Sequence, residues 1–265
     1  MKKIIINADD FAMAESCTLA ICEAFRRGLI TDTSMTANGD AEELALQLIR
    51  ENELLKDRIG IHFQLSEGVP LTTEMRENRK FVTDGRFNAY FRSNLHYFVP
   101  LSPKDRRAIH GELTAQVQKL RSLGIPITHA DSHFHVHYNW QLAPIFVQVC
   151  RENRIRKMRI NKNVEDRGWL RNFLFRSYNG YLKRRIPITV DHFEDACRYT
   201  VIPEGISEIM VHPDFDRDGM LINRKKRISK GGMSYGAQGD ALEKDLARIL
   251  SGEEEKISYR SLSRS

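Results

Sequence analysis

The chain has 265 residues, of which 41% are hydrophobic and 29% charged, so it can bury a sizeable core and is not compositionally disordered. This length suits one large domain or two small ones. A formal net charge of +6 is only mildly basic, below the charge density of a dedicated nucleic-acid-binding protein, so we expect no nucleic-acid partner.

The sequence predicts neither export nor membrane insertion. Its first ten residues hold only three strongly apolar side chains before two acidic residues, which excludes a signal peptide. No apolar run approaches the roughly 18 residues that a transmembrane helix needs. The four cysteines form no C-x-x-C pair, so we expect reduced thiols in a cytoplasmic protein; they are Cys17, Cys22, Cys150 and Cys197.

Short β-branched runs alternate with longer amphipathic stretches along the chain. Strands are predicted at residues 3–7, 34–38, 58–65, 127–132, 157–161, 207–212 and 257–262. Helices are predicted at residues 16–27, 41–51, 102–123, 141–153 and 240–250. The third helix has the clearest start, because Ser102 suits an N-cap and Pro103 the first helical position.

Three stretches fall outside this alternation. Residues 69–100 and 164–190 are excursions rich in aromatic side chains, and residues 213–239 read as a polar loop. Long loops of this kind often carry substrate contacts.

The alternation of strands and helices predicts an α/β fold with a largely parallel sheet. At this length we expect a single-domain TIM-like (β/α) barrel over residues 1–265, with fewer than eight regular units. The first strand–helix junction lacks a Gly-x-Gly-x-x-Gly loop, which disfavours a dinucleotide-binding sheet.

Polar residues collect where the predicted strands end, which is the edge where α/β barrels build their active sites. Asp9 and Asp10 directly follow the first strand. Two adjacent carboxylates at the end of a buried strand are costly unless a cation neutralises them. The pair therefore indicates a metal site, although helix-capping acids remain an alternative.

Histidines supply the other candidate ligands. His62 lies in the strand at residues 58–65, and four of the nine histidines lie in residues 128–137. If that segment stays extended, five side chains share one face; they are His129, Asp131, His133, His135 and His137. So many ionisable groups on one face are hard to explain as packing.

One carboxylate and two histidines from separate strands form a facial triad that leaves positions open on a metal. Such a metal lowers the pKa of its bound water and polarises a carbonyl, the chemistry of amide and ester hydrolysis. Asp9, beside the candidate ligand Asp10, could then serve as the general base. His212, at the end of the strand at residues 207–212, could protonate a leaving amine or hold the oxyanion, or it could simply be fixed by the turn at Pro213.

These motifs resemble those of the YdjC-like carbohydrate deacetylases, a family that includes chitooligosaccharide and hopanoid-associated deacetylases. The matching segments are Asn7 to Phe11, Gly60 to Phe63 with Glu67 to Leu71, Thr128 to His137, and Val211 to Pro213. The resemblance implies a TIM-like barrel, a divalent metal held by Asp10, His62 and His133, and Asp9 as catalytic base. It also implies hydrolysis of an N-acetyl group from an amino sugar, with magnesium or zinc as the metal.

The chain departs from the family pattern at two positions. Ala12 stands where the family usually has glycine, and Phe134 where it usually has a polar residue. We expect Ala12 to constrain the first strand–helix turn and Phe134 to change how the site is walled.

A basic stretch covers residues 151–187, where twelve basic and three acidic residues give a net charge of +9. A further basic cluster follows His212; it comprises Arg224, Lys225, Lys226, Arg227 and Lys230. Both could be solvated surface, or they could steer an anionic sugar substrate.

Two other functions stay open at this point, as does self-association into a homo-oligomer. The first is a non-catalytic glycan- or polyanion-binding protein that retains a metal site. The second is a non-haem iron oxygenase, because two histidines and a carboxylate also suit ferrous iron.

Overall fold

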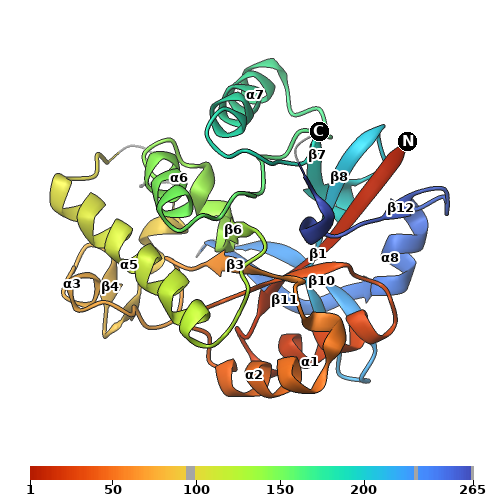
Figure 1. The fold of residues 1–265 in the computed structure, drawn as a ribbon, viewed down its shortest axis with the longest axis horizontal. Helices are drawn as coiled ribbons and strands as arrows, with labels where there is room; N and C mark the ends of the chain where they lie inside the picture. Colours follow the sequence, from red (N-terminus) through yellow and green to blue (C-terminus); the bar gives the residue numbers. More distant parts are fainter. Residues whose placement is uncertain (94–98, 230–231, 264–265) are drawn as a thin grey trace.

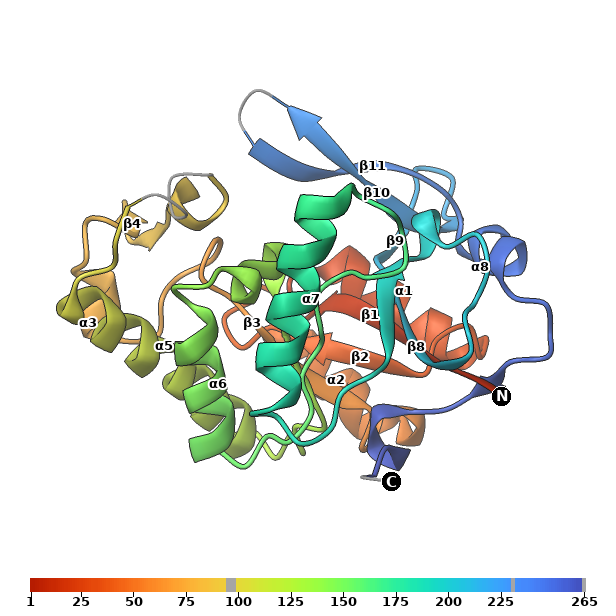
Figure 2. The same cartoon turned by 90° about the horizontal axis from the view of Figure 1, so that it is seen from above.

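A computed structural model describes residues 1–93, 99–229 and 232–263, with side chains described outside residues 225–238. At its centre lies a curled parallel sheet with helices on its outside (Figures 1 and 2). The strands lie in the order β6-β3-β2-β1-β8-β7, and β12 pairs with β1 as a branch. Their bounds are β1 Lys2–Phe11, β2 Asp32–Met35, β3 Ile59–Phe63, β6 Ala130–Ser132, β7 His192–Asp195, β8 Gly205–Val211 and β12 Glu255–Lys256.

Strand β1 contains a continuous run of apolar side chains followed by mostly polar ones. Ile4, Ile5 and Ile6 of β1 are fully buried, and β1 pairs in parallel with β8 from Lys2 to Ala8. Continuous apolar runs of this kind are typical of parallel strands that are covered on both faces. The predicted α/β class and parallel sheet are therefore confirmed.

A regular TIM-like barrel is not confirmed. Residues 157–161, predicted as a strand, make only two isolated parallel bridges among the described residues, Ala130 with Met158 and Lys157 with Ile188. The ladder is interrupted because the backbone N–H of Asn161 donates to the side chain of Asn179 instead of to a neighbouring strand. The sheet is a distorted half-barrel that these bridges extend.

The predicted helices form within a few residues of their expected bounds. They are α1 Glu15–Arg26, α2 Glu42–Glu51, α5 Pro103–Ser122, α6 Ala143–Glu152 and α8 Leu242–Ile249. Ser102 caps α5 as predicted, in a capping box with Asp105. None of the described helices combines the length and apolar character needed to cross a bilayer.

In the described part of the excursion at residues 69–100 the elements are short; they are α3 Thr73–Arg76, β4 Val82–Thr83, β5 Arg86–Phe87 and a 3₁₀ turn at Ala89–Phe91. Its aromatic side chains hold it together, since Phe81 stacks on Phe91 at a centroid distance of 4.9 Å and meets Tyr90 edge-on. Two aromatic residues of this excursion, Tyr97 and Phe98, lie outside the described residues.

Three sequence predictions are corrected. The excursion at residues 164–190 contains a full helix, α7 Trp169–Lys183, whose inward face buries Tyr178 and Leu182. After β9 Pro213–Phe215, the predicted polar loop is an antiparallel pair, β10 Leu221–Ser229 and β11 Gly232–Ala241, because backbone pairing does not require apolar side chains. The last predicted strand, at residues 257–262, is replaced by β12 and a 3₁₀ turn at Tyr259–Ser261.

Asp32, at the start of β2, is a buried carboxyl far from the strand ends that carry the candidate site. Its Oδ1 accepts hydrogen bonds from Ser258 and from the backbone of Tyr259, whereas Oδ2 has no partner among the described residues. Burial raises the pKa of Asp32 to about 7, and the nearby hydrogen bonds only partly oppose this.

We expect Asp32→Asn to change how stability depends on pH. Because the folded-state pKa lies above the usual value of 3.8, the group stabilises the fold fully below about pH 4 and loses this contribution as the pH rises through 7. Relative to the variant, the parent should lose up to about 4 kcal/mol of unfolding free energy between about pH 4 and pH 8. Urea denaturation at both pH values measures this, and an equal offset between the two proteins at both would contradict it.

Candidate metal centre

The candidate residues from four strands meet at one edge of the sheet. Asp9 and Asp10 lie near the end of β1, His62 in β3, His133 directly after β6 and His212 directly after β8. All five are buried, with exposed fractions of 1–4%. They meet because the carboxyl ends of parallel strands face the same way.

Asp10, His62 and His133 form the tightest cluster. His133 Nδ1 lies 2.8 Å and His62 Nε2 lies 3.2 Å from Asp10 Oδ1. The two ring nitrogens are 3.3 Å apart. Ligand atoms about 2.1 Å from a shared metal ion are themselves about 3.0–3.4 Å apart, so this cluster fits a divalent cation.

Asp131 strengthens this fit from behind His62. Its Oδ1 lies 2.7 Å from His62 Nδ1 and accepts the ring hydrogen there, so that Nε2 is the nitrogen that would bind a metal once it loses its own hydrogen. Burial acts to lower the pKa of His62, but the charge of Asp131 and the hydrogen bonds that the ring donates to Asp10 and Asp131 raise it to about 10. The cluster therefore attracts positive charge, as a metal site must.

An irregular end to β1 lets two consecutive carboxylates serve one site. Adjacent strand residues normally point to opposite faces, but the pairing of β1 with β2 shifts register between Ala8 and Phe11. Asp10 and Ala12 have left-handed backbones, with φ of 72° and 68°. The expected constraint at Ala12 is thus present, since only glycine adopts this conformation freely.

Asp9 forms an ion pair with a buried arginine, Arg159, which belongs to the basic stretch at residues 151–187. Arg159 is fully buried, and its guanidinium contacts both oxygens of Asp9 at 2.6 and 2.7 Å. It also reaches Asp131 and Glu208, each at 2.8 Å. Burial raises the pKa of Asp9, but the charge and hydrogen bonds of Arg159 outweigh it and hold that pKa well below its usual range.

The signal that could have found Arg159 was its place in the predicted strand at residues 157–161. Its neighbours Met158 and Ile160 are buried, whereas Arg156 is exposed. A side chain inside a buried run is itself a candidate for burial, and a buried arginine needs carboxylate partners.

The prediction that five side chains of residues 128–137 share one face is wrong. The strand ends at Ser132, and a 3₁₀ segment with left-handed backbones at Phe134 and His135 follows. His135 therefore stacks on Tyr138, and the His137 ring contacts Ser132 Oγ at 2.5 Å. Of the other three, Asp131 and His133 reach the cluster.

His129 lies deeper in the sheet. Its Nε2 is 3.0 Å from Asn7 Oδ1, and its ring stacks on Tyr259 at a centroid distance of 4.0 Å. Gly60 of the matching motif is explained by this packing, because a Cβ there would lie 2.5 Å from the His129 ring.

His212 lies beside Asp9. Its Nε2 is 4.0 Å from Asp9 Oδ2, and its backbone N–H donates to Asn223 Oδ1 at 2.8 Å. This brings the second predicted catalytic side chain within reach of the first.

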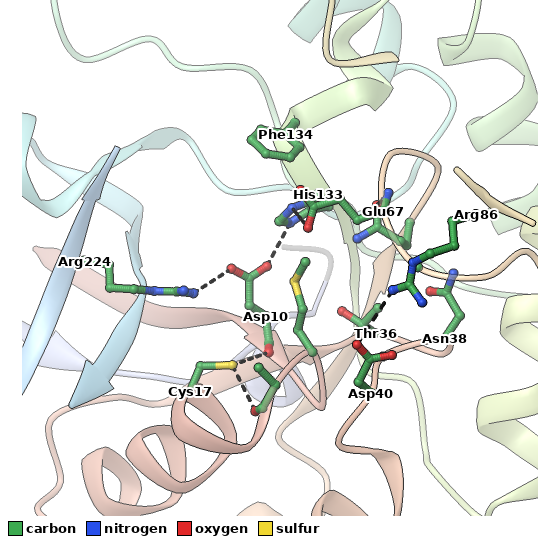
Figure 3. Close-up of a pocket in the computed structure, with 15 residues that line it drawn as sticks. Asp10, Cys17, Thr36, Asn38, Asp40, Glu67, Arg86, His133, Phe134 and Arg224 are labelled. Atoms are coloured by element: carbon green, nitrogen blue, oxygen red, sulfur yellow. Dashed lines mark hydrogen bonds and ion pairs between the residues drawn. The ribbon is translucent and has the colours of Figure 1, made fainter. Parts of the chain in front are cut away.

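A cavity of about 340 Å³ opens over the cluster. Figure 3 shows Asp10 between His133 and Arg224, with Phe134 beside them. Arg224 Nη2 lies 3.2 Å from Asp10 Oδ2, and its Nε lies 3.3 Å from Asp214. Phe134 lines this cavity, as expected for a residue that walls the site.

Arg224 of the basic cluster after His212 lines the cavity. The side chains of Lys225, Lys226, Arg227 and Lys230 lie outside those that the structure describes.

Fold and site together define an α/β protein with a candidate metal centre at the carboxyl edge of a curled parallel sheet. The family described as YdjC-like protein matches residues 3–252, and the chain belongs to this family. A carbohydrate deacetylase of Brevibacillus brevis is 30% identical over 225 residues, which cover 83% of this chain and 84% of that protein.

Two further comparisons are more limited. A carbohydrate deacetylase of Vibrio campbellii is 33% identical over 156 residues, but the match covers 58% of this chain and only 57% of that protein's length. A crystal structure from Enterococcus faecalis, described as a proposed cellobiose-phosphate cleavage protein, covers 99% of both chains with a TM-score of 0.69. Its identity of 23% supports the shared fold alone.

Proposed function

We propose that the protein is a metal-dependent deacetylase that hydrolyses the N-acetyl group of an acetylated amino sugar. The observation that carries the proposal is the buried convergence of Asp10, His62 and His133 beside Asp9, beneath an open cavity. The similarity to carbohydrate deacetylases supports deacetylation of a carbohydrate.

In this proposal Asp10, His62 and His133 hold the divalent ion, and Asp131 orients His62. When bound, the ion lowers the pKa of a water molecule and polarises the acetyl carbonyl. Two nitrogen donors favour zinc or another transition ion over magnesium.

Asp9 is the proposed general base. Arg159 keeps it ionised and fixes its plane, so that its carboxylate can accept the proton of the attacking water. His212, 4.0 Å from Asp9, is the proposed acid that returns a proton to the leaving amine nitrogen. After this step Asp9 carries the proton of the water and His212 lacks the one it gave to the amine, so a proton must pass from Asp9 to His212, across the 4.0 Å between them, to restore both groups.

This arrangement favours an enzyme over a binding protein that retains a metal. A binding site has no use for a second buried carboxylate held ionised beside the ligand set, because keeping it buried is costly. The parallel α/β scaffold also disfavours a non-haem iron oxygenase, whose site more usually sits on an all-β scaffold.

The direct test is acetate release from N-acetylated sugars by protein stripped with chelator and reloaded with zinc, magnesium, cobalt or manganese. The panel includes neutral and phosphorylated sugars, since Arg86 and Arg224 line the cavity. We expect acetate with at least one metal and none after chelation.

A matched pair of variants from one segment sharpens this test. His133→Ala should lose bound metal and acetate release, whereas His135→Ala, whose ring stacks on Tyr138, should keep bound metal. Glycan binding without acetate release by fully metallated protein would contradict the proposal, as would parental metal content in His133→Ala.

A further inference from the structure

Helix α7 exposes an unusual concentration of large apolar side chains. Of the twelve such exposed side chains in the described residues, four lie in its first six positions. They are Trp169, Leu170, Phe173 and Leu174, with exposed fractions of 81%, 53%, 62% and 45%. We call these four residues the α7 outer face. Contiguous exposed apolar surface of this kind marks an interaction site.

The helix that carries this face is anchored to the body of the protein. Tyr178 and Leu182 are buried on its inner side, and the Tyr178 hydroxyl donates to the backbone oxygen of His137. Trp140 packs edge-on against Tyr178 and Tyr181 of the same helix. The apolar side chains are therefore presented by a fixed element.

Exposed positive charge is concentrated in the stretch of chain that contains α7, and five of the exposed basic side chains lie on α7 or directly after it; they are Arg171, Arg176, Lys183, Arg184 and Arg185. In residues 151–187 eight basic side chains are exposed; they are Arg151, Arg154, Arg156, Arg171, Arg176, Lys183, Arg184 and Arg185. Exposed acids in the same stretch are Glu152, which pairs with His110, and Asp166. A helix with tryptophan, phenylalanine and leucine on one side and arginine or lysine around it has the composition of helices that lie in a membrane interface.

The α7 outer face lies at the same end of the molecule as the cavity. Residues 157–161 run parallel to β6, so the chain leaves them at the carboxyl edge of the sheet and enters α7 from there. The helix lies on the periphery in Figure 1 and faces the viewer in Figure 2.

We propose that the α7 outer face and the exposed arginines and lysines along the same helix bind the surface of an anionic lipid bilayer. The charge decides between this partner and a second copy of the chain. A symmetric dimer would bring the same basic surface of two subunits together, and like charges at an interface oppose association. An anionic bilayer instead accepts the apolar side chains among its headgroups and neutralises the arginines.

The test is co-sedimentation of the full chain with vesicles rich in phosphatidylglycerol and with vesicles of phosphatidylcholine. We expect binding to the anionic vesicles that weakens with added salt and is at least about tenfold weaker to the neutral ones. The double variant Trp169→Ser/Phe173→Ser should lose binding at least about tenfold. Its control, Leu54→Ser/Val201→Ser, removes two exposed apolar side chains elsewhere and should bind like the parent.

A second pair of variants separates charge from apolar contact. Arg171→Glu/Arg176→Glu reverses two charges on α7, whereas Lys104→Glu/Arg107→Glu makes the same change on exposed positions of α5. Only the α7 pair should reduce binding to anionic vesicles by about tenfold or more.

Tryptophan fluorescence reports which side chain enters the bilayer. The chain has two tryptophans, so Trp140→Phe leaves Trp169 as the only indole. Its emission should shift to shorter wavelength with anionic vesicles and be quenched by brominated lipid. The proposal is overturned if the parent does not bind these vesicles or if the α7 outer-face variant binds them as well as the parent. It is also overturned if light scattering shows a dimer for the parent and a monomer for that variant. These readouts are independent of deacetylation.

Discussion

Asp9→Asn is expected to lower kcat for acetate release by about 10²- to 10⁴-fold while the protein keeps its bound metal. Asparagine preserves the size of the side chain but cannot accept the proton of the attacking water. Asp9 also lies outside the proposed ligand set, so metal content should stay near that of the parent. Acetate release and metal analysis on the same preparation measure both effects.

The matched control for this variant is Asp32→Asn, which makes the same chemical change at another buried aspartate on the neighbouring strand. Asp32 bonds to Ser258 and Tyr259 near the start of β2, away from the cluster. The Asp32→Asn variant should therefore release acetate at a rate close to that of the parent. Parental kcat in a fully metallated Asp9→Asn protein would mean that another group takes the proton.

The residues of the site could be predicted because parallel strands impose a simple rule. Polar side chains after a buried strand meet those after its neighbours, so one carboxylate of the Asp9–Asp10 pair, His62 and a histidine of residues 128–137 could be expected to meet. The choice of Asp10 and His133 came from the family resemblance. In the structure one oxygen of Asp10 and one ring nitrogen each of His62 and His133 lie within 3.3 Å of one another.

The local backbone at the site could not be predicted in the same way. Extending the odd-numbered pattern through residues 128–137 assumes a strand, but Phe134 and His135 adopt left-handed conformations that non-glycine residues rarely adopt. Such conformations are stabilised by the packing around them, as in the contact of His133 with Phe134. The sequence pattern of one segment does not specify the contacts that this segment makes with the rest of the fold.

Arg159 was missed for a related reason. Its sequence neighbours are basic and several are exposed, so net charge alone suggests a solvated surface. What buries Arg159 is a set of carboxylates supplied by three other strands, Asp9, Asp131 and Glu208. Helix α7 was not predicted because its apolar residues lie on two sides of the helix. Only the inward side packs against the core.

The same arginine gives the largest expected effect on stability. Arg159→Met should lower the free energy of unfolding by about 3–5 kcal/mol, because it leaves buried carboxylates without their shared cation. The structure predicts this cost from the contacts of one guanidinium with Asp9, Asp131 and Glu208. Acetate release should fall too, since nothing then fixes the plane of Asp9.

Two further variants make the result specific to that network. Arg156→Met changes the same side chain three residues earlier at an exposed position, where we expect a change within about 0.5 kcal/mol. Arg159→Lys keeps the charge but cannot form the paired contacts with Asp9, so it should recover only part of the lost stability. If Arg159→Met unfolds at the same urea concentration as Arg156→Met, the contacts of Arg159 with the buried carboxylates make no net contribution to stability, and the prediction is wrong.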